Sequence, residues 1–168
     1  FDRFDEVIRL NADVYILNFG VVDACTREIP RWVFNLNNGL AQRWYNRLSR
    51  SLYGGIIKRI RRPLVFLRLR RSWVGKRAFR RLYTLLVQTL LKESNAVIIG
   101  LSINPANDRV ERQLPGSRKK QLQYNEIIRE CLTTERCRYL DLGDLISEEH
   151  YPDGVHYSAK GHRIVAER

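Results

Sequence analysis

The 168 residues are enough for one domain with a sizeable hydrophobic core. With 44% hydrophobic and 10% aromatic residues, the composition is typical of a soluble globular protein and excludes a disordered chain, and no apolar run approaches the roughly 20 residues that span a bilayer. The net charge of +12 indicates an affinity for acidic glycans, anionic lipids or nucleic acid, since no acidic residue lies between Glu28 and Glu93.

The first half of the chain alternates helical and strand patterns. Residues 1–10 have apolar residues at helical spacing, and the run 14–19 (VYILNF) that stops at Gly20 predicts a buried parallel strand. Helical spacing returns over 30–48 and over 76–93. The predicted apolar side of that last helix consists of Phe79, Leu82, Leu86 and Leu90.

The second half continues the alternation. Residues 96–101 predict a second buried strand, 102–116 a loop and 118–132 an amphipathic helix. A third short strand is expected at 138–142, and a closing helix begins near Ser158, which is a suitable N-cap.

Strands that alternate with helices predict an α/β fold with a parallel sheet between two helical layers, a three-layer α/β/α arrangement. Functional sites in such sheets lie at the carboxyl ends of the strands. The loops after Phe19, Leu101 and Leu142 are therefore expected to form the site.

The C-terminal string DGVHYSAKGH carries the strongest chemical pattern. Asp153 precedes His156 by three residues, so its carboxylate can reach the imidazole Nδ1 within one turn. That contact would fix the tautomer and leave Nε2 to take a proton from a hydroxyl nucleophile. His150 belongs to no motif and is expected in solvent.

This string resembles the last block of the SGNH (GDSL-like) hydrolases, which has the form DGxHx…GH. The resemblance implies a flavodoxin-like SGNH hydrolase fold and a serine esterase activity. It also implies catalytic roles for His156 and Asp153, and structural roles for Gly161 and His162.

Residues 20–23 (GVVD) resemble the G-x-N-D block of the same family. The resemblance implies that the Gly20 N–H helps to bind the oxyanion and that Asp23 is structural. Val22 replaces the asparagine donor, and such a donor is typically worth a few kcal/mol of transition-state stabilisation. Arg27 could substitute for it or bind an anionic substrate group, or it could be an ordinary surface arginine.

The family's nucleophilic serine stands in a GDS motif ahead of the block that begins here at Val14. No serine of this sequence has that context: Ser49, Ser51, Ser72, Ser94, Ser102, Ser117, Ser147 and Ser158. We therefore expect the N-terminal β-α-β portion of the fold to be absent from this chain. Alone, the chain should be inactive and poorly stable, because apolar sheet edges would be exposed.

Residues 48–81 lie outside the resemblance and are predicted to be a basic insertion in a single domain spanning 1–168. The run 58–71 (KRIRRPLVFLRLRR) alternates cationic and bulky apolar residues, a pattern continued to residue 81. It is predicted to form a core-packed basic face, a contact with an anionic membrane, or a lid. Nucleic acid is the least favoured partner, because paired aromatics on a strand are absent.

The resemblance thus predicts that the full-length protein is an ester hydrolase, or a related acyltransferase, acting on O-acyl groups of a glycan or glycolipid. The alternative is a non-catalytic basic α/β module that holds anionic membrane or nucleic acid, or a degenerate scaffold. No metal or organic cofactor is implied. The cysteines, Cys25, Cys131 and Cys137, are expected to be buried thiols of a cytoplasmic protein, peripheral at a membrane, with Cys25 also a candidate for lining the site.

Overall fold

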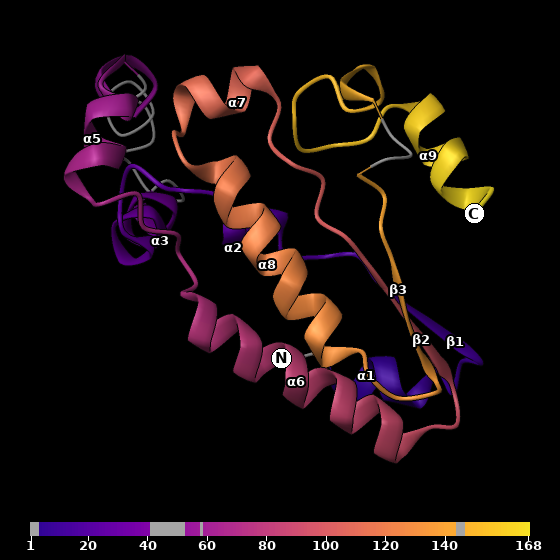
Figure 1. Ribbon diagram of the computed structural model, residues 1–168. Helices are drawn as coiled ribbons and strands as arrows, with labels where there is room; N and C mark the ends of the chain where they lie inside the picture. Colours follow the sequence, from indigo (N-terminus) through magenta and orange to yellow (C-terminus); the bar gives the residue numbers. More distant parts are fainter. Residues whose placement is uncertain (1–3, 41–52, 58, 144–146) are drawn as a thin grey trace.

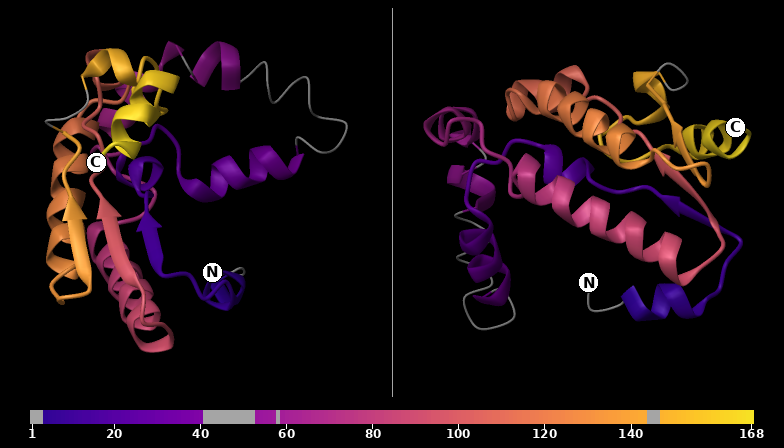
Figure 2. Two further views of the ribbon diagram at one scale, coloured as in Figure 1. Left: turned by 90° about the vertical axis from the view of Figure 1, so that its right-hand side faces the viewer. Right: turned by 60° about the horizontal axis from the view of Figure 1, so that its bottom comes forward.

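A computed structural model describes residues 4–40, 53–57, 59–143 and 147–168 (Figure 1). Its centre is a parallel sheet in the order β1-β2-β3, made of β1 (Val14–Leu17), β2 (Val97–Leu101) and β3 (Cys137–Leu140). The strands point in one direction (Figure 2), so their carboxyl ends meet at one edge of the sheet. The predicted parallel α/β sheet is confirmed.

Helices connect the strands. Those of the described residues are α1 (Phe4–Arg9), α2 (Val21–Ala24), α3 (Arg31–Leu40), the π-helical turn η1 (Tyr53–Ile57), α5 (Arg61–Leu67), α6 (Lys76–Glu93), α7 (Asp108–Gln113), α8 (Ser117–Cys131), the 3₁₀ turn η2 (Glu148–His150) and α9 (Ala159–Ala166). None of them is both long enough and apolar enough to be a membrane span.

One face of the sheet is covered by α6 and α8. The α6 side chains buried there are Phe79, Tyr83, Val87 and Leu90. The buried side of α6 is therefore rotated from the predicted apolar side, and Leu82 and Leu86 are only half-buried. The ring of Phe79 lies 4.8 Å from that of Tyr124 on α8, so aromatic contacts between the helices select the buried side.

The opposite face is covered by α9 only over β2 and β3, where Ile164 and Val165 pack against a buried cluster that includes Leu101 of β2. On β1 the outward side chains Val14 and Ile16 are exposed. The prediction that this strand is buried on both faces is wrong for the described part of the chain, because no described helix covers its outer side.

The connection 102–116 was predicted as a loop, and that prediction is wrong, because it contains α7. The Asn107 side chain caps this helix by accepting a hydrogen bond from the Val110 N–H at 3.0 Å. At the other end, the Glu111 carboxylate accepts from the backbone N–H groups of Gly116 and Arg118 and holds the turn into α8.

Within the predicted insertion, α5 lies beside α7 at the end of the molecule where the strands finish (Figure 1). Val65 is fully buried, and the Trp73 indole N–H donates to the Ile29 carbonyl at 2.9 Å. Residues 41–52 and 58, which carry the end of the predicted helix 30–48 and part of the predicted insertion 48–81, lie outside the described residues.

Candidate active site

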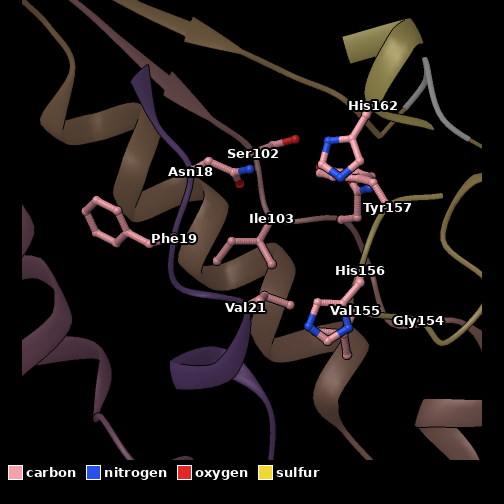
Figure 3. A pocket seen from close by; sticks show the side chains of 11 residues that line it. Asn18, Phe19, Val21, Ser102, Ile103, Gly154, Val155, His156, Tyr157 and His162 are labelled. Atoms are coloured by element: carbon pink, nitrogen blue, oxygen red, sulfur yellow. The ribbon is translucent and has the colours of Figure 1, made fainter. Parts of the chain in front are cut away.

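A pocket of about 230 Å³ opens at the carboxyl edge of the sheet (Figure 3). Its lining comes from the loop after β1, the loop after β2 and the C-terminal loop: Asn18, Phe19, Val21, Ser102, Ile103, Asn104, Gly154, Val155, His156, Tyr157 and His162. The structure thus brings the DGVHYSAKGH string together with two of the three predicted loops. The third, after Leu142, passes through residues 144–146, outside the described residues, and from Ser147 on it leads into the DGVHYSAKGH string that lines the pocket.

Asp153 and His156 form the contact that their spacing predicts. The Asp153 Oδ2 lies 2.6 Å from the His156 Nδ1, while its Oδ1 accepts from the backbone N–H groups of Val155 at 2.9 Å and of His156 at 2.7 Å. The imidazole is 82% exposed. A carboxylate on Nδ1 holds the proton there, so Nε2 is left as the basic nitrogen.

The carboxylate of this pair stays ionised. Burial acts to raise the pKa of Asp153, but hydrogen bonds from the His156 backbone N–H, its ring and the Val155 N–H outweigh it and lower the pKa to about 2. Asp153 is therefore negatively charged throughout the neutral range and can stabilise an imidazolium at His156.

Gly154 fits the loop against α7. Its φ is +77°, and a Cβ there would come within 2.5 Å of a Val110 methyl and 2.6 Å of the Asn107 Oδ1. A side chain at this position would strain the backbone and displace the α7 cap. The helix that the sequence did not predict thus supports the turn that holds Asp153 and His156.

Gly161 and His162 lie on the first turn of α9, which Ser158 caps as predicted by accepting from the Gly161 N–H at 3.2 Å. A Cβ on Gly161 would lie 2.5 Å from the His150 carbonyl oxygen, so the glycine allows α9 to approach the preceding loop. The His162 ring meets that of Tyr157 edge-on at 5.4 Å, on the side of the pocket away from His156 (Figure 3).

His150 is buried, so the prediction that it lies in solvent is wrong. Its Nδ1 accepts from the Ser147 backbone N–H at 3.2 Å and lies 2.8 Å from the Ser147 hydroxyl oxygen. Both contacts join residues three apart and close the η2 turn.

Gly20 follows β1 by three residues and is the N-cap of α2, with φ +111°; a Cβ there would lie 3.0 Å from Ile103 and 3.2 Å from Phe79. Two residues on, the Val22 side chain is exposed and does not line the His156 pocket. Burial raises the pKa of Asp23, against the opposing effect of Arg31 and Arg27.

Arg27 lies in a different, neighbouring pocket of about 290 Å³. Its guanidinium stacks 4.3 Å from the Trp73 ring and donates through Nη2 to the Val22 carbonyl at 2.9 Å. Arg61 and Asp153 also line this pocket, so Arg27 shares a pocket with the aspartate of the pair and does not line the pocket that holds His156.

The cysteines are free thiols. Cys25 and Cys137 are buried as predicted, and Cys131 is half-buried. Cys25 lines the Arg27 pocket, where it accepts a hydrogen bond from Gln121 at 3.3 Å, and burial raises its pKa. A raised pKa keeps the thiol protonated and unreactive. Among the described residues, no three His, Cys, Asp or Glu side chains gather as metal ligands.

Sequence reasoning missed several polar residues of the His156 pocket. Asn18 precedes Gly20, and Asn104 lines the same pocket as Tyr157, whose pKa is raised by burial. Ser102 accepts from the Leu142 N–H at 2.8 Å and so ties the exits of β2 and β3 together. Their positions just after predicted strands could have identified them as pocket residues, because the carboxyl ends of parallel strands share one edge of the sheet.

The comparisons with known proteins agree with the motif. A family model described as the GDSL-like lipase/acylhydrolase family matches residues 1–164. A search of individual curated proteins gave no match. The family model covers the sheet, the pocket and the Asp153–His156 turn, so the resemblance seen in the C-terminal string is confirmed.

Proposed function

Because the chain belongs to the GDSL-like lipase/acylhydrolase family, a family of ester hydrolases, we propose that it provides the general base of a serine esterase. His156 is that base and Asp153 is its partner. The observation that carries the proposal is the 2.6 Å contact between the Asp153 Oδ2 and the His156 Nδ1, with Asp153 ionised and the imidazole accessible beside the pocket.

In the proposed reaction the serine hydroxyl gives its proton to the His156 Nε2 while its oxygen attacks the ester carbonyl carbon. The tetrahedral oxyanion collapses, and the alcohol leaves with the proton from Nε2. Water then attacks the acyl-enzyme by the same route and releases the acid and the serine. Asp153 stays ionised and stabilises the imidazolium in both halves.

The nucleophile is proposed to come from outside the described residues, as the resemblance implies for the β-α-β portion ahead of Val14. Within those residues, several serine hydroxyls bind backbone groups: Ser72 donates to Ala24 O, Ser94 to Leu90 O and Ser117 to Leu114 O, while Ser102 accepts from Leu142 N. The described part of β1 pairs only with β2, so a further strand could join its other edge and end beside Gly20.

The oxyanion is proposed to bind to the Gly20 N–H and, in place of the donor that Val22 lacks, to the Asn18 amide, which lines the His156 pocket. Arg27 is proposed to bind an anionic group of the substrate, because its pocket adjoins the Asp153 turn. An O-acylated acidic glycan or glycolipid fits such a site.

We expect Arg27→Gln to lower kcat/KM for an ester with an anionic acyl group roughly tenfold, the low end for a lost hydrogen bond to a charged group. The loss should be smaller for a neutral ester. The measurement compares the p-nitrophenyl monoester of succinate with p-nitrophenyl butyrate, and Arg112→Gln, an exposed arginine on α7, is the matched control. Equal losses on both esters would contradict this role for Arg27.

The protein encoded by the complete open reading frame tests the proposal as a whole. We expect it to hydrolyse p-nitrophenyl acetate and to react stoichiometrically with a fluorophosphonate, and we expect peptide mapping to place the label on a serine ahead of Val14. A folded protein that neither hydrolyses the ester nor takes the label would favour the basic binding module or a degenerate scaffold.

A further inference from the structure

Large apolar side chains crowd the C-terminal end of α5 and are open to solvent. Leu67 is 79% exposed and Leu69 is 75% exposed, and Phe66 beside them is also exposed. We call Phe66, Leu67 and Leu69 the apolar tip. Exposed leucines are common singly, but adjacent ones on a turn mark a contact surface.

The backbone holds this tip in place. Leu69 and Arg70 both have φ +53°, a conformation that is costly for bulky residues and persists only where surrounding contacts impose it. Here the Leu69 N–H donates to Phe66 O and the Arg70 N–H to Val65 O, each at 2.8 Å. The Arg68 guanidinium adds a bond at 2.8 Å to the Arg27 carbonyl. The exposure of the leucines is therefore built into the turn.

Exposed arginines lie on α5 and next to it. Arg59, Arg62, Arg70 and Arg71 are exposed, and the Arg70 guanidinium lies 4.7 Å from the centre of the Phe66 ring. Arg61, on the inner side, is paired with Glu28 at 3.1 Å. Because the sequence has no acidic residue between Glu28 and Glu93, this surface carries a positive field around apolar side chains.

We propose that the apolar tip inserts into the headgroup region of an anionic lipid bilayer, with the exposed arginines on the lipid phosphates and carboxylates. This pairing explains both features at once, since apolar side chains bury in the acyl boundary while cations remain at the surface. A nucleic acid backbone would engage the arginines but would leave the leucines in water.

Docking through the tip would bring the candidate active site to the membrane. Arg61 of α5 and Asp153 of the catalytic turn line the same pocket, and Figure 1 shows α5 at the end of the molecule where the strands finish. Membrane binding itself does not depend on the proposed esterase activity, so each can fail without the other.

The test is co-sedimentation of the protein from the complete open reading frame with vesicles of phosphatidylcholine alone or mixed with phosphatidylserine. We expect binding to the mixed vesicles that weakens as salt is raised. Leu67→Asp with Leu69→Asp should lower the partition coefficient by roughly two powers of ten, since a buried leucine contributes about tenfold each. Leu122→Asp, at a 50% exposed leucine on α8, should leave it unchanged.

Circular dichroism and hydrolysis of p-nitrophenyl acetate in solution should be the same for the double variant and the unmodified protein, which separates lost docking from lost folding or lost catalysis. Equal vesicle binding by the double variant, or equal binding to phosphatidylcholine alone, would overturn the proposal. Binding to duplex DNA in the absence of vesicle binding would assign the arginines to nucleic acid instead.

Discussion

His156→Ala is expected to lower kcat/KM for p-nitrophenyl acetate by roughly four to six powers of ten in the protein from the complete open reading frame. A serine hydroxyl is a poor nucleophile without a base, and removing the histidine of such a set removes most of its catalysis. The 82% exposed ring makes little packing contribution, so the variant should fold as the unmodified protein does.

His162→Ala is the matched control, because its ring lines the same pocket and carries the same ionisable group. That ring contacts Tyr157 edge-on, whereas the ring of His156 is held by Asp153. We therefore expect a much smaller loss from His162→Ala, about tenfold at most on the scale of a packing change near a site. A larger loss from His162→Ala than from His156→Ala would move the general base to His162.

The sequence predicted the features that depend on local spacing. The Asp153–His156 contact and the Ser158 cap on Gly161 each join residues three apart in sequence. The helix α6 has the predicted bounds of Lys76–Glu93. The parallel sheet followed from apolar runs separated by helical patterns. In each case the relevant neighbours lie within a few turns along the chain, where sequence spacing and spatial distance agree.

The features that the sequence did not predict depend on which elements pack together. Ser102–Gly116 contains two prolines and reads as a loop, yet the Asn107 cap and the contact with Gly154 stabilise a helix there. His150 is enclosed by α9, which follows it in the chain. Arg27 follows the GVVD block of residues 20–23 by only a few residues in sequence. Its side chain nevertheless stacks on Trp73 and lines the neighbouring pocket.

The one-sided burial of β1 has the same origin. The exposed Val14 and Ile16 alternate with the buried Tyr15 and Leu17. The sequence does not reveal which face is exposed, because the residues that point to either face of this short strand are all apolar. Only the placement of α9 over β2 and β3 shows which side is open.

Asp153→Asn is expected to lower kcat by roughly two to four powers of ten while leaving the turn in place. The amide oxygen can still accept from the Val155 and His156 N–H groups, but the amide nitrogen cannot accept from the His156 Nδ1. The imidazole then loses both its orientation and the negative charge that stabilises the imidazolium. Asp141→Asn is the matched control, since both side chains are 48% exposed and Asp141 caps a turn elsewhere.

The pH dependence of stability checks the same pair independently of activity. The pKa of Asp153 in the folded protein, about 2, lies below its ordinary value of 3.8, so the pair favours folding fully above the ordinary value and loses its effect as pH falls toward 2. The Tm difference between the unmodified protein and Asp153→Asn should therefore shrink across that window and stay constant at higher pH. A difference that persists at the acidic end would show that the asparagine disturbs packing, and a kcat loss would then not measure the carboxylate. A difference that shrinks across the window, with kcat reduced as expected, would assign the loss to the missing carboxylate charge beside the His156 Nδ1.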